Sequence, residues 1–574
     1  MNEVCYWYFC FTPISTSHSI KIFGFSEFLA AIALLAVVYT ITDFRYKFRI
    51  AVTPGYLYVS TFILIAIIGL QTLLTEVWIA ESWWVPKTAW ITHHTWQGIF
   101  GLLFLGTFLT WIYYAFIRPP VFSRRNARRF AQELYRIILR GNNNELKVIA
   151  NELARSAEPL IRYSRLVSRR LGSQDEPQKL IKKKPGAEDY AYDILLLIAN
   201  RKLCRQIVAA SPVTAQAFFE EMTDQNKFDV PIGQFARNIS SEAVIQTESF
   251  LYGEAEGYES GLLGYLKPVS QAIYGNYKLV EALAANGISP LDVHFEEQWS
   301  WNAKQWGAYC RATLIALESY LASGRYYENS YSLNRAMHDI ESSFRDLYKL
   351  DNMPDAYGSD AYERLRVAAD FIKNAIELID KQPNPPKPLQ RVREGTYPKN
   401  IYDHLALLIF EMCFDASAIK SPQETCWSIY YSIVWNNTFN GFSDGTAWKI
   451  MRSKVSRLLY DEIVQLTEMP NYKGKGTRIL GFCLNILLGT HMKPTKGNYG
   501  RDSYALAKAV QSWTRKHYLP MRQNNLDVAE SVLIGRLGFD EAGSRLFITY
   551  AKGLNQEAPK SYLELELPQE KHCE

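Results

Sequence analysis

The residues best suited to chemistry lie at 441–445, where the chain reads G-F-S-D-G and matches the G-x-S-x-G pattern of a serine nucleophile. In that pattern a sharp strand-to-helix turn exposes the serine hydroxyl, here Ser443, for attack on an acyl group. An acid and a histidine base would have to follow, as Asp461 with His491 or as Asp502 with His517. The surrounding sequence is helical in pattern, whereas this motif belongs to a fold rich in parallel strands. The sequence therefore favours a protein that is not an enzyme and keeps Ser443 as a catalytic candidate.

The sequence supports a metal site or a nucleotide site less than it supports the serine nucleophile. His93 and His94 are adjacent, but their loop adds only Glu76 and Glu81 as further ligands. Two other combinations are possible ligand sets: His294 with Glu296 and Glu297, and His338 with Glu341. The chain has no H-E-x-x-H motif, no zinc-type cysteine spacing and no glycine-rich phosphate loop of the known patterns. We therefore expect neither a metal nor a cofactor.

Three apolar segments dominate the first part of the chain. Two of them, residues 50–75 and 88–117, exceed the roughly 20 residues that a helix needs to cross a bilayer. The first segment, 28–42, is shorter, and a signal peptide is its alternative interpretation, but the first 20 residues contain no Lys or Arg. We expect an extracytoplasmic segment at 1–21 and a transmembrane domain at 22–117, with helices at about 24–44, 52–74 and 95–117.

The two longer segments are free of charge, since neither contains any Asp, Glu, Lys or Arg. Ion and proton pathways usually require such groups inside the membrane. The segments therefore favour an anchor over a transporter that acts as a monomer, and they leave an oligomeric pore open.

Basic residues around the segments predict their orientation. Arg45, Lys47 and Arg49 lie between the first two segments, and Arg118 begins a further basic stretch after the third. The connection between the second and third contains a single basic residue, Lys87. Because positively charged loops stay in the cytoplasm, we expect a multi-pass protein of the cell (inner or plasma) membrane, with its N-terminus outside and its C-terminus cytoplasmic.

Aromatic residues mark both ends of the predicted membrane helices. Indole and phenol rings favour the level of the lipid headgroups. The outer group is Trp78, Trp83, Trp84, Trp90 and Trp96, and the inner group is Trp111, Tyr113 and Tyr114. We expect all of these side chains to lie at the membrane interfaces.

The stretch after the third segment is strongly basic, with 17 Lys and Arg against 6 Asp and Glu between Arg118 and Lys184. Ser123 is a suitable N-cap for a helix whose apolar stripe is Phe130, Leu134, Ile137 and Ile138. Each basic residue near an anionic leaflet contributes roughly 1 kcal/mol. We expect headgroup contacts from Arg124, Arg125, Arg128, Arg129, Arg136 and Arg140, although the same charges could serve orientation alone. Nucleic acid is a less favoured partner.

The rest of the chain has a mostly helical pattern. We expect basic juxtamembrane helices at 118–171, a loop or linker at 172–189, a helical cytoplasmic domain at 190–380, a proline-rich linker at 381–400 and a second helical domain at 401–574. Apolar stripes at 333–347 and 365–379 predict an antiparallel helical hairpin or a coiled-coil surface for self-association. Residues 546–550 have the pattern of a strand.

Cysteine usage adds one open question. Six of the eight cysteines follow the last apolar segment and are expected to be reduced. Cys5 and Cys10 would face the oxidising side, where either a disulfide or two free thiols is possible.

The fold class predicted is therefore mostly α, with a three-helix transmembrane unit followed by a large, predominantly helical cytoplasmic region. The leading functional hypothesis is a membrane-anchored sensor, scaffold or effector that acts by binding a protein or a ligand. Two alternatives are an oligomeric membrane-permeabilising effector gated by the cytoplasmic region and a membrane-bound serine hydrolase using Ser443.

Overall fold

The computed structural model is mostly helical and divides into two compact units, residues 1–235 and 236–574. It describes the chain except for residues 1–3, 7–8, 14–21, 42, 54–56, 87–92, 165–184, 258–267, 325–328, 383–399, 440–444, 468–473, 490–495, 551–559 and 568–574. Most of the predicted linkers at 172–189 and 381–400 lie outside the described residues. The domain boundaries predicted from the sequence stay predictions.

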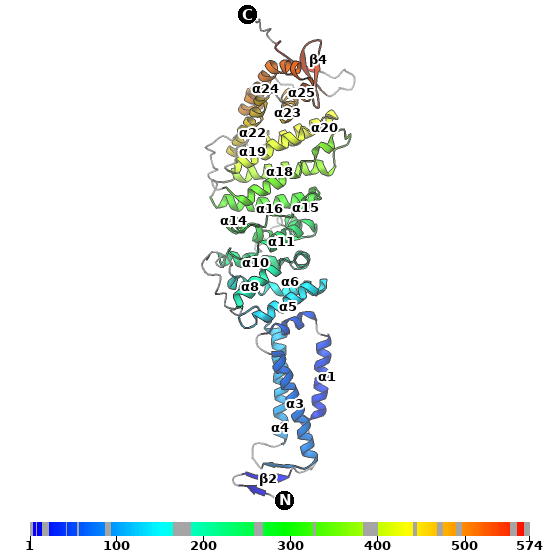
Figure 1. Ribbon diagram of the computed structural model, residues 1–574, viewed down its shortest axis with the longest axis vertical. Helices are drawn as coiled ribbons and strands as arrows, with labels where there is room; N and C mark the ends of the chain where they lie inside the picture. Colours follow the sequence, from blue (N-terminus) through cyan, green and yellow to red (C-terminus); the bar gives the residue numbers. More distant parts are fainter. Residues whose placement is uncertain are drawn as a thin grey trace, which may run out of the picture. The chain divides into compact units, whose positions relative to one another are not determined.

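The apolar segments of the first unit form three apolar helices, α1 (Phe25–Ile41), α3 (Leu57–Ala80) and α4 (His93–Ile112), and α4 continues as the π-helical turn η1 (Tyr113–Ile117). Two stretches, Val59–Ala80 and His94–Ile117, are long and apolar enough to cross a membrane. The apolar part of α1, Phe25–Val37, is shorter. The expectation of three spanning helices is thus supported for two helices, by length and composition (Figure 1).

Two features of this region were not predicted. The basic connection between the first two segments is itself a helix, α2 (Phe44–Ala51). An antiparallel sheet joins β1 (Val4–Tyr6), β2 (Phe9–Pro13) and β3 (Trp84–Pro86), so the N-terminal segment pairs with the connection between α3 and α4.

Short helices complete the first unit: α5 (Ala127–Arg140), α6 (Asn143–Ala154), α7 (Ala157–Tyr163), α8 (Ala187–Leu197), α9 (Arg201–Ala210) and α10 (Pro212–Asp224). The predicted stripe of α5 is confirmed, because Phe130, Leu134, Ile137 and Ile138 are all buried. The predicted N-cap is wrong: Asn126 precedes the helix, and the hydroxyl of Ser123 donates to the side-chain oxygen of Asn126 at 3.0 Å. A turn at 124–126 separates Ser123 from the first helical residue, so its hydroxyl reaches a side chain and not the helix amides.

Helix α11 (Gly233–Ile245) crosses the division between the units, and the second unit is built mainly from helices that follow one another in layers (Figure 1). Its longer helices are α14 (Tyr277–Ala285), α16 (Ala303–Ala322), α17 (Tyr331–Ser342), α18 (Asp360–Asp380), α19 (Ile401–Ala416), α22 (Thr446–Gln465), α23 (Gly474–Gly489) and α24 (Lys496–Asn524). The shorter ones are α12 (Phe250–Gly257), α13 (Val269–Tyr274), α15 (Phe295–Gln298), η4 (Leu347–Leu350), α20 (Gln423–Trp427), η5 (Ser428–Trp435), α21 (Asn436–Thr438) and α25 (Leu526–Glu530).

A three-stranded antiparallel sheet lies near the C-terminal end of the described chain. Its strands are β4 (Leu537–Asp540), β5 (Arg545–Thr549) and β6 (Lys560–Glu564), paired in that order. The strand predicted at 546–550 is therefore confirmed, and it is the central strand of this sheet.

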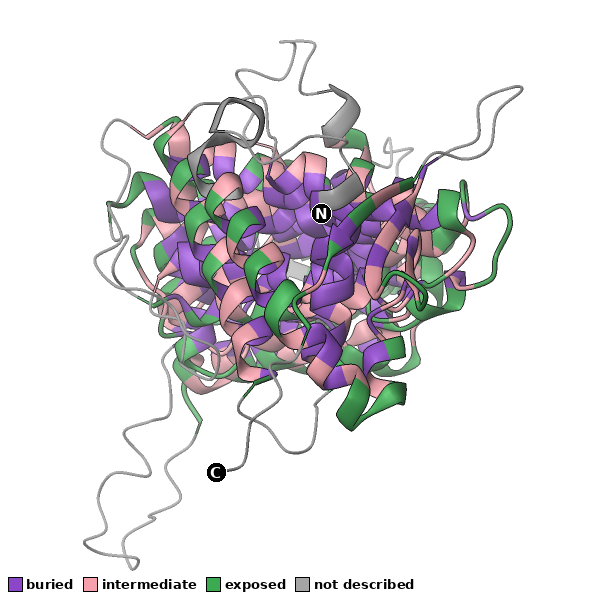
Figure 2. Ribbon diagram, turned by 90° about the horizontal axis from the view of Figure 1, so that it is seen from above, coloured by how far each residue is buried: buried purple, intermediate pink, exposed green. Residues whose placement is uncertain are grey.

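The predicted hairpin of 333–347 with 365–379 is wrong. Helix α18 packs mainly on α16 and also on α22, whereas α17 packs on α14, α16 and α19. Both apolar stripes are buried, and α16 is a neighbour of both helices; α18 also contacts η4, which begins at Leu347, the last residue of the first stripe. Buried residues follow the inner faces of the helices (Figure 2). Because these stripes are covered within the chain, neither offers the predicted coiled-coil surface.

Candidate functional site

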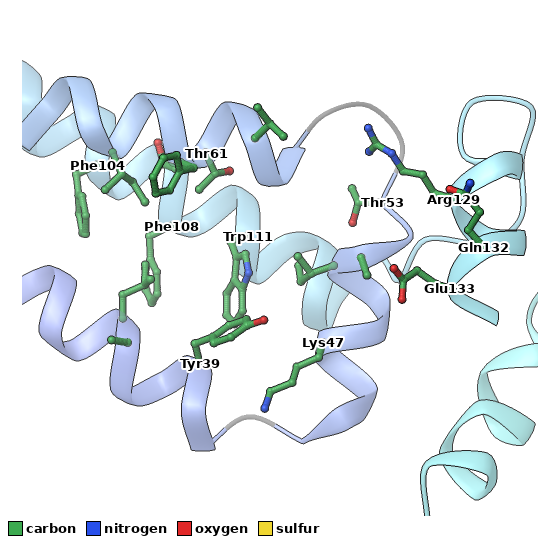
Figure 3. Close-up of a pocket in the computed structure, with 18 of the residues that line it drawn as sticks. Tyr39, Lys47, Thr53, Thr61, Phe104, Phe108, Trp111, Arg129, Gln132 and Glu133 are labelled. Carbon is green, nitrogen blue, oxygen red and sulfur yellow. The ribbon is translucent and has the colours of Figure 1, made fainter. Parts of the chain in front are cut away.

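The first unit contains a cavity of about 800 Å³ between α1, α2, α3, α4 and α5. One part of its wall is apolar and comes from the apolar helices α1, α3 and α4: Leu35, Ala36, Ile65, Phe104, Phe108 and Trp111. The other part is polar and comes from α2 and α5: Lys47, Arg129, Gln132, Glu133 and Arg136. Figure 3 shows Phe104 and Phe108 apart from Arg129, Gln132 and Glu133, whereas Lys47 extends toward Tyr39. The site is therefore amphipathic.

The cavity exists because α1 is packed tightly at only one end. There Phe28 forms a buried cluster with Ile68 and Phe100. Gly69 allows this approach, since a β-carbon added to it would collide with the ring of Phe28. The amide of Phe25 also donates to a carboxylate oxygen of Glu76 at 3.0 Å. The opposite end of α1 lines the cavity instead.

Three cations and one carboxylate line the polar end. The side-chain nitrogen of Lys47 lies 5.5 Å from the centre of the Tyr39 ring. Arg136 forms an ion pair with Glu133, with 2.8 Å between nitrogen and oxygen. Arg129 completes the set on the same helix as Arg136. The polar end of the cavity therefore contains the Arg136–Glu133 ion pair together with Lys47 and Arg129.

A buried ion pair holds α2 in place behind the cavity. Arg49 donates from Nε and Nη2 to the two carboxylate oxygens of Glu152, at 2.9 and 2.7 Å, and from Nη1 to the carbonyl of Ala115 at 2.8 Å. The carbonyl of Ala115 lies in the last turn of its helix, where carbonyls lack helical partners. Helix α2 is thereby connected to α6 and to η1, which fixes the position of Lys47 on the same short helix.

Asn126 positions the beginning of α5. Its side-chain nitrogen donates to the carbonyls of Val52 and Val121 at 2.8 and 3.0 Å. These bonds join the end of α2 to the segment before α5 and bring Arg129, about one turn later, to the cavity wall.

The predicted headgroup arginines divide into two groups. Arg129 and Arg136 line the cavity. The others are exposed on the surface of the unit: Arg124, Arg125, Arg128 and Arg140. The sequence prediction missed Lys47, Gln132 and Glu133 as members of a common site. The basic, amphipathic pattern of residues 44–51 was the signal that could have identified α2.

The predicted interfacial aromatic residues differ in exposure. Trp78, Trp83, Trp84, Trp96 and Tyr113 are exposed, whereas Trp111 and Tyr114 are half-buried. Trp90 lies outside the described residues. Trp111 belongs to the cavity wall, so one member of the predicted inner group has a more specific environment than the others.

The catalytic candidates are only partly described. Ser443 and His491 lie outside the described part of the chain. Gly445 is described, and a β-carbon added there would overlap the carboxylate of Asp380. That carboxylate accepts a hydrogen bond from the amide of Ala447 at 2.7 Å, at the start of α22. The last glycine of the G-x-S-x-G match thus has a structural reason to be a glycine.

The remaining histidine candidates have ordinary partners. The ring of His517 lies 5.1 Å from that of Trp513, centre to centre, in a tilted arrangement, and burial lowers the pKa of His517. His294 makes a hydrogen bond to Asn238 at 2.9 Å, and His338 approaches Glu341 at 3.3 Å. Within the described ranges, no three His, Cys, Asp or Glu side chains are grouped so that they could hold a metal ion.

The second unit contains a separate group of charged residues around Asp415 on α19. Burial and, to a smaller extent, the nearby carboxylates of Glu411 and Glu341 raise the pKa of Asp415 to about 7, against the opposing effect of Arg478. Glu411 itself pairs with Lys475 at 2.8 Å. Asp415 is therefore a carboxyl group that titrates near neutral pH.

Comparison with known proteins adds no family assignment. No protein-family model matches this chain, and no curated protein matches it. Its function is therefore inferred from its own residues and their geometry.

Proposed function

We propose that this chain is a multi-pass protein of the cell membrane whose helical C-terminal region acts in the cytoplasm as a sensor, scaffold or effector, by binding a protein or a ligand. The exposure of α3 and α4 supports the membrane location. Only 17% and 11% of their most apolar stretches are buried. Phe62, Leu102 and Ile117 are 69%, 69% and 70% exposed. Exposed apolar surface costs about 25 cal/mol per Å² in water, a cost that lipid removes.

Helix α1 is proposed as a third crossing. Its 17 residues span about 25 Å at 1.5 Å per residue, against a hydrocarbon core of about 30 Å. Glu27 in its first turn would then lie at the outer interface. The basic helices α2 and α5 would lie on the cytoplasmic side, in agreement with the positive-inside rule.

The Arg49–Glu152 pair supports a sensor role. This pair joins α2 to α6. Helix α2 borders the cavity, and α6 is one of the short helices that follow α4 in the first unit. A ligand that moves α2 would therefore act on α6 through a buried contact.

The permeabilising effector and the Ser443 hydrolase stay predictions. Dye uptake on overexpression tests the permeabilising effector. A Ser443→Ala variant that keeps full activity in any functional assay of the protein would remove the hydrolase hypothesis.

Fractionation and labelling test the proposed location and orientation. The intact chain should remain in membranes after carbonate extraction, and recovery in the soluble fraction would defeat the proposal. In a background with Cys5, Cys10 and Cys573 replaced by Ser, Glu81→Cys should react with a membrane-impermeant maleimide in intact cells. Arg140→Cys should react only after permeabilisation. The reverse pattern would overturn the orientation.

A further inference from the structure

We propose that the cavity binds one hydrocarbon chain of a bilayer lipid, whatever its headgroup, between the cavity end of α1 and the helices α3 and α4. This inference rests on the proposed membrane location of α3 and α4, and it names the class of ligand of the site described above.

The wall formed by the apolar helices fits a hydrocarbon chain. Ile65 on α3 contributes aliphatic surface, while Phe104 and Phe108 contribute two rings one turn apart on α4. The hydroxyl of Thr107 in the same wall donates to the carbonyl of Leu103 at 2.7 Å, so its hydrogen bond is made within its own helix. The volume of about 800 Å³ lies within the range of about 300–1,000 Å³ of small-molecule sites.

The charged end of the cavity does not select a headgroup. Arg136 pairs with Glu133 at 2.8 Å, and the side-chain nitrogen of Lys47 lies 5.5 Å from the centre of the Tyr39 ring. Figure 3 shows Lys47 directed at Tyr39 and away from Arg129, so these two cations do not converge on one group. Recognition therefore depends on the apolar wall.

A lipid chain supplies the packing that the protein lacks at this end of α1. The other end is packed by Phe28 against Ile68 and Phe100. An empty cavity would deprive the surrounding side chains of van der Waals contacts, and water would find few hydrogen-bonding partners along the apolar wall. In the proposed location, bilayer lipid is the apolar molecule that surrounds these helices. We therefore expect the chain to stabilise the packing of α1.

Native mass spectrometry of the detergent-solubilised full chain tests the proposal. When dioleoylphosphatidylcholine and dioleoylphosphatidylglycerol are supplied in equal amounts, we expect one retained lipid per chain and no preference between the two. Ala36→Trp would fill the cavity from α1 and should weaken retention about tenfold or more. Ala30→Trp is the matched control and should retain lipid like the parent, because Ala30 is exposed and lies on the opposite face of the same helix.

Thermal unfolding gives a second readout. Adding dioleoylphosphatidylcholine to the delipidated protein should raise the melting temperature of the parent and of Ala30→Trp, because the lipid binds the folded state. The melting temperature of Ala36→Trp should not respond, since the indole ring takes the place of the chain. Circular dichroism and gel filtration check that the variants fold. If Ala36→Trp does not, the smaller Ala36→Leu narrows the same space and should weaken retention in the same direction.

Three results would overturn the proposal. Equal losses of lipid in Ala36→Trp and Ala30→Trp would indicate lipid bound to the outer surface of the helices. A strong preference for phosphatidylglycerol would indicate recognition of a charged headgroup. A membrane-embedded chain that retains no lipid would defeat this inference alone, whereas a soluble chain would defeat the proposed function.

Discussion

Arg49 and Glu152 lie 103 residues apart and form a bidentate ion pair whose side chains are only 6% and 7% exposed. Both charges have been removed from water, and the Arg49 charge is compensated by Glu152, whose carboxylate is also approached by Arg45 at 3.6 Å. Their contact connects α2 to α6 and is completed by the carbonyl of Ala115. Arg49, one of the basic residues from which the membrane orientation is predicted, thus also joins α2 to α6 in the folded chain.

Replacing one partner of this pair should be strongly destabilising. We expect Glu152→Gln to lower the free energy of unfolding by about 3–5 kcal/mol, because it leaves the Arg49 charge buried without compensation. Thermal unfolding of the full chain in detergent measures the effect. Glu158→Gln is the control: its pair with Arg162 is about half exposed on both sides, and it should cost less than about 1 kcal/mol. Similar losses in both variants would contradict the prediction.

Asp415 should make stability depend on pH. Its pKa is about 7 in the folded protein and 3.8 for the unperturbed group, so at pH 6 the folded state holds a proton that the unfolded state has released. Stability should therefore fall by about 1 kcal/mol between pH 6 and pH 8. Denaturant unfolding at the two pH values measures this change. Asp415→Asn should lose this component, and an unchanged pH profile in the variant would refute the assignment.

Gly445 should be intolerant of a side chain. We expect Gly445→Ala to destabilise the protein by about 1–3 kcal/mol, because its β-carbon would displace the Asp380 carboxylate that binds the start of α22. Gly307→Ala, inside α16 with no atom near the added carbon, should instead be neutral or stabilising by up to about 1 kcal/mol. Comparison of the two melting temperatures measures the difference, and equal shifts would argue against the capping role.

Cys5 and Cys10 should form a disulfide. The register of β1 and β2 places them opposite each other. Directly opposed residues of antiparallel strands have α-carbons about 4.5–5.5 Å apart, within the range that a disulfide bridges. Alkylation of the purified protein with and without reductant, followed by mass spectrometry, should show two extra modified thiols after reduction. Full alkylation of both cysteines without reductant would contradict the prediction.

Local patterns predicted some parts of this structure well. The stripe of Phe130 and Leu134 in α5 is buried as expected, because helical periodicity determines which side chains share a face. The same reasoning failed for the stripes of α17 and α18. It identified two faces that must be buried and assigned them to each other, whereas α18 packs on α16 and α22.

The cavity could not be predicted from the sequence for a related reason. Its wall combines Lys47 and Arg129 with Phe104, and these residues belong to three helices. Their meeting depends on the way in which α1 is packed at one end and lines the cavity at the other. Glu152 gave no sign in the sequence that it would be the partner of Arg49.

The sequence by itself determined the local properties of this protein: the length and apolarity of α3 and α4, the basic character of the segments beside them and the helical nature of the remainder. Each of these depends on residues within a few turns of one another. Only the tertiary structure decided that Arg49 binds Glu152, that Gly445 makes room for Asp380 and that an amphipathic cavity lies beside α5. These features join residues distant in the chain, and their partners are selected by the packing of the whole unit.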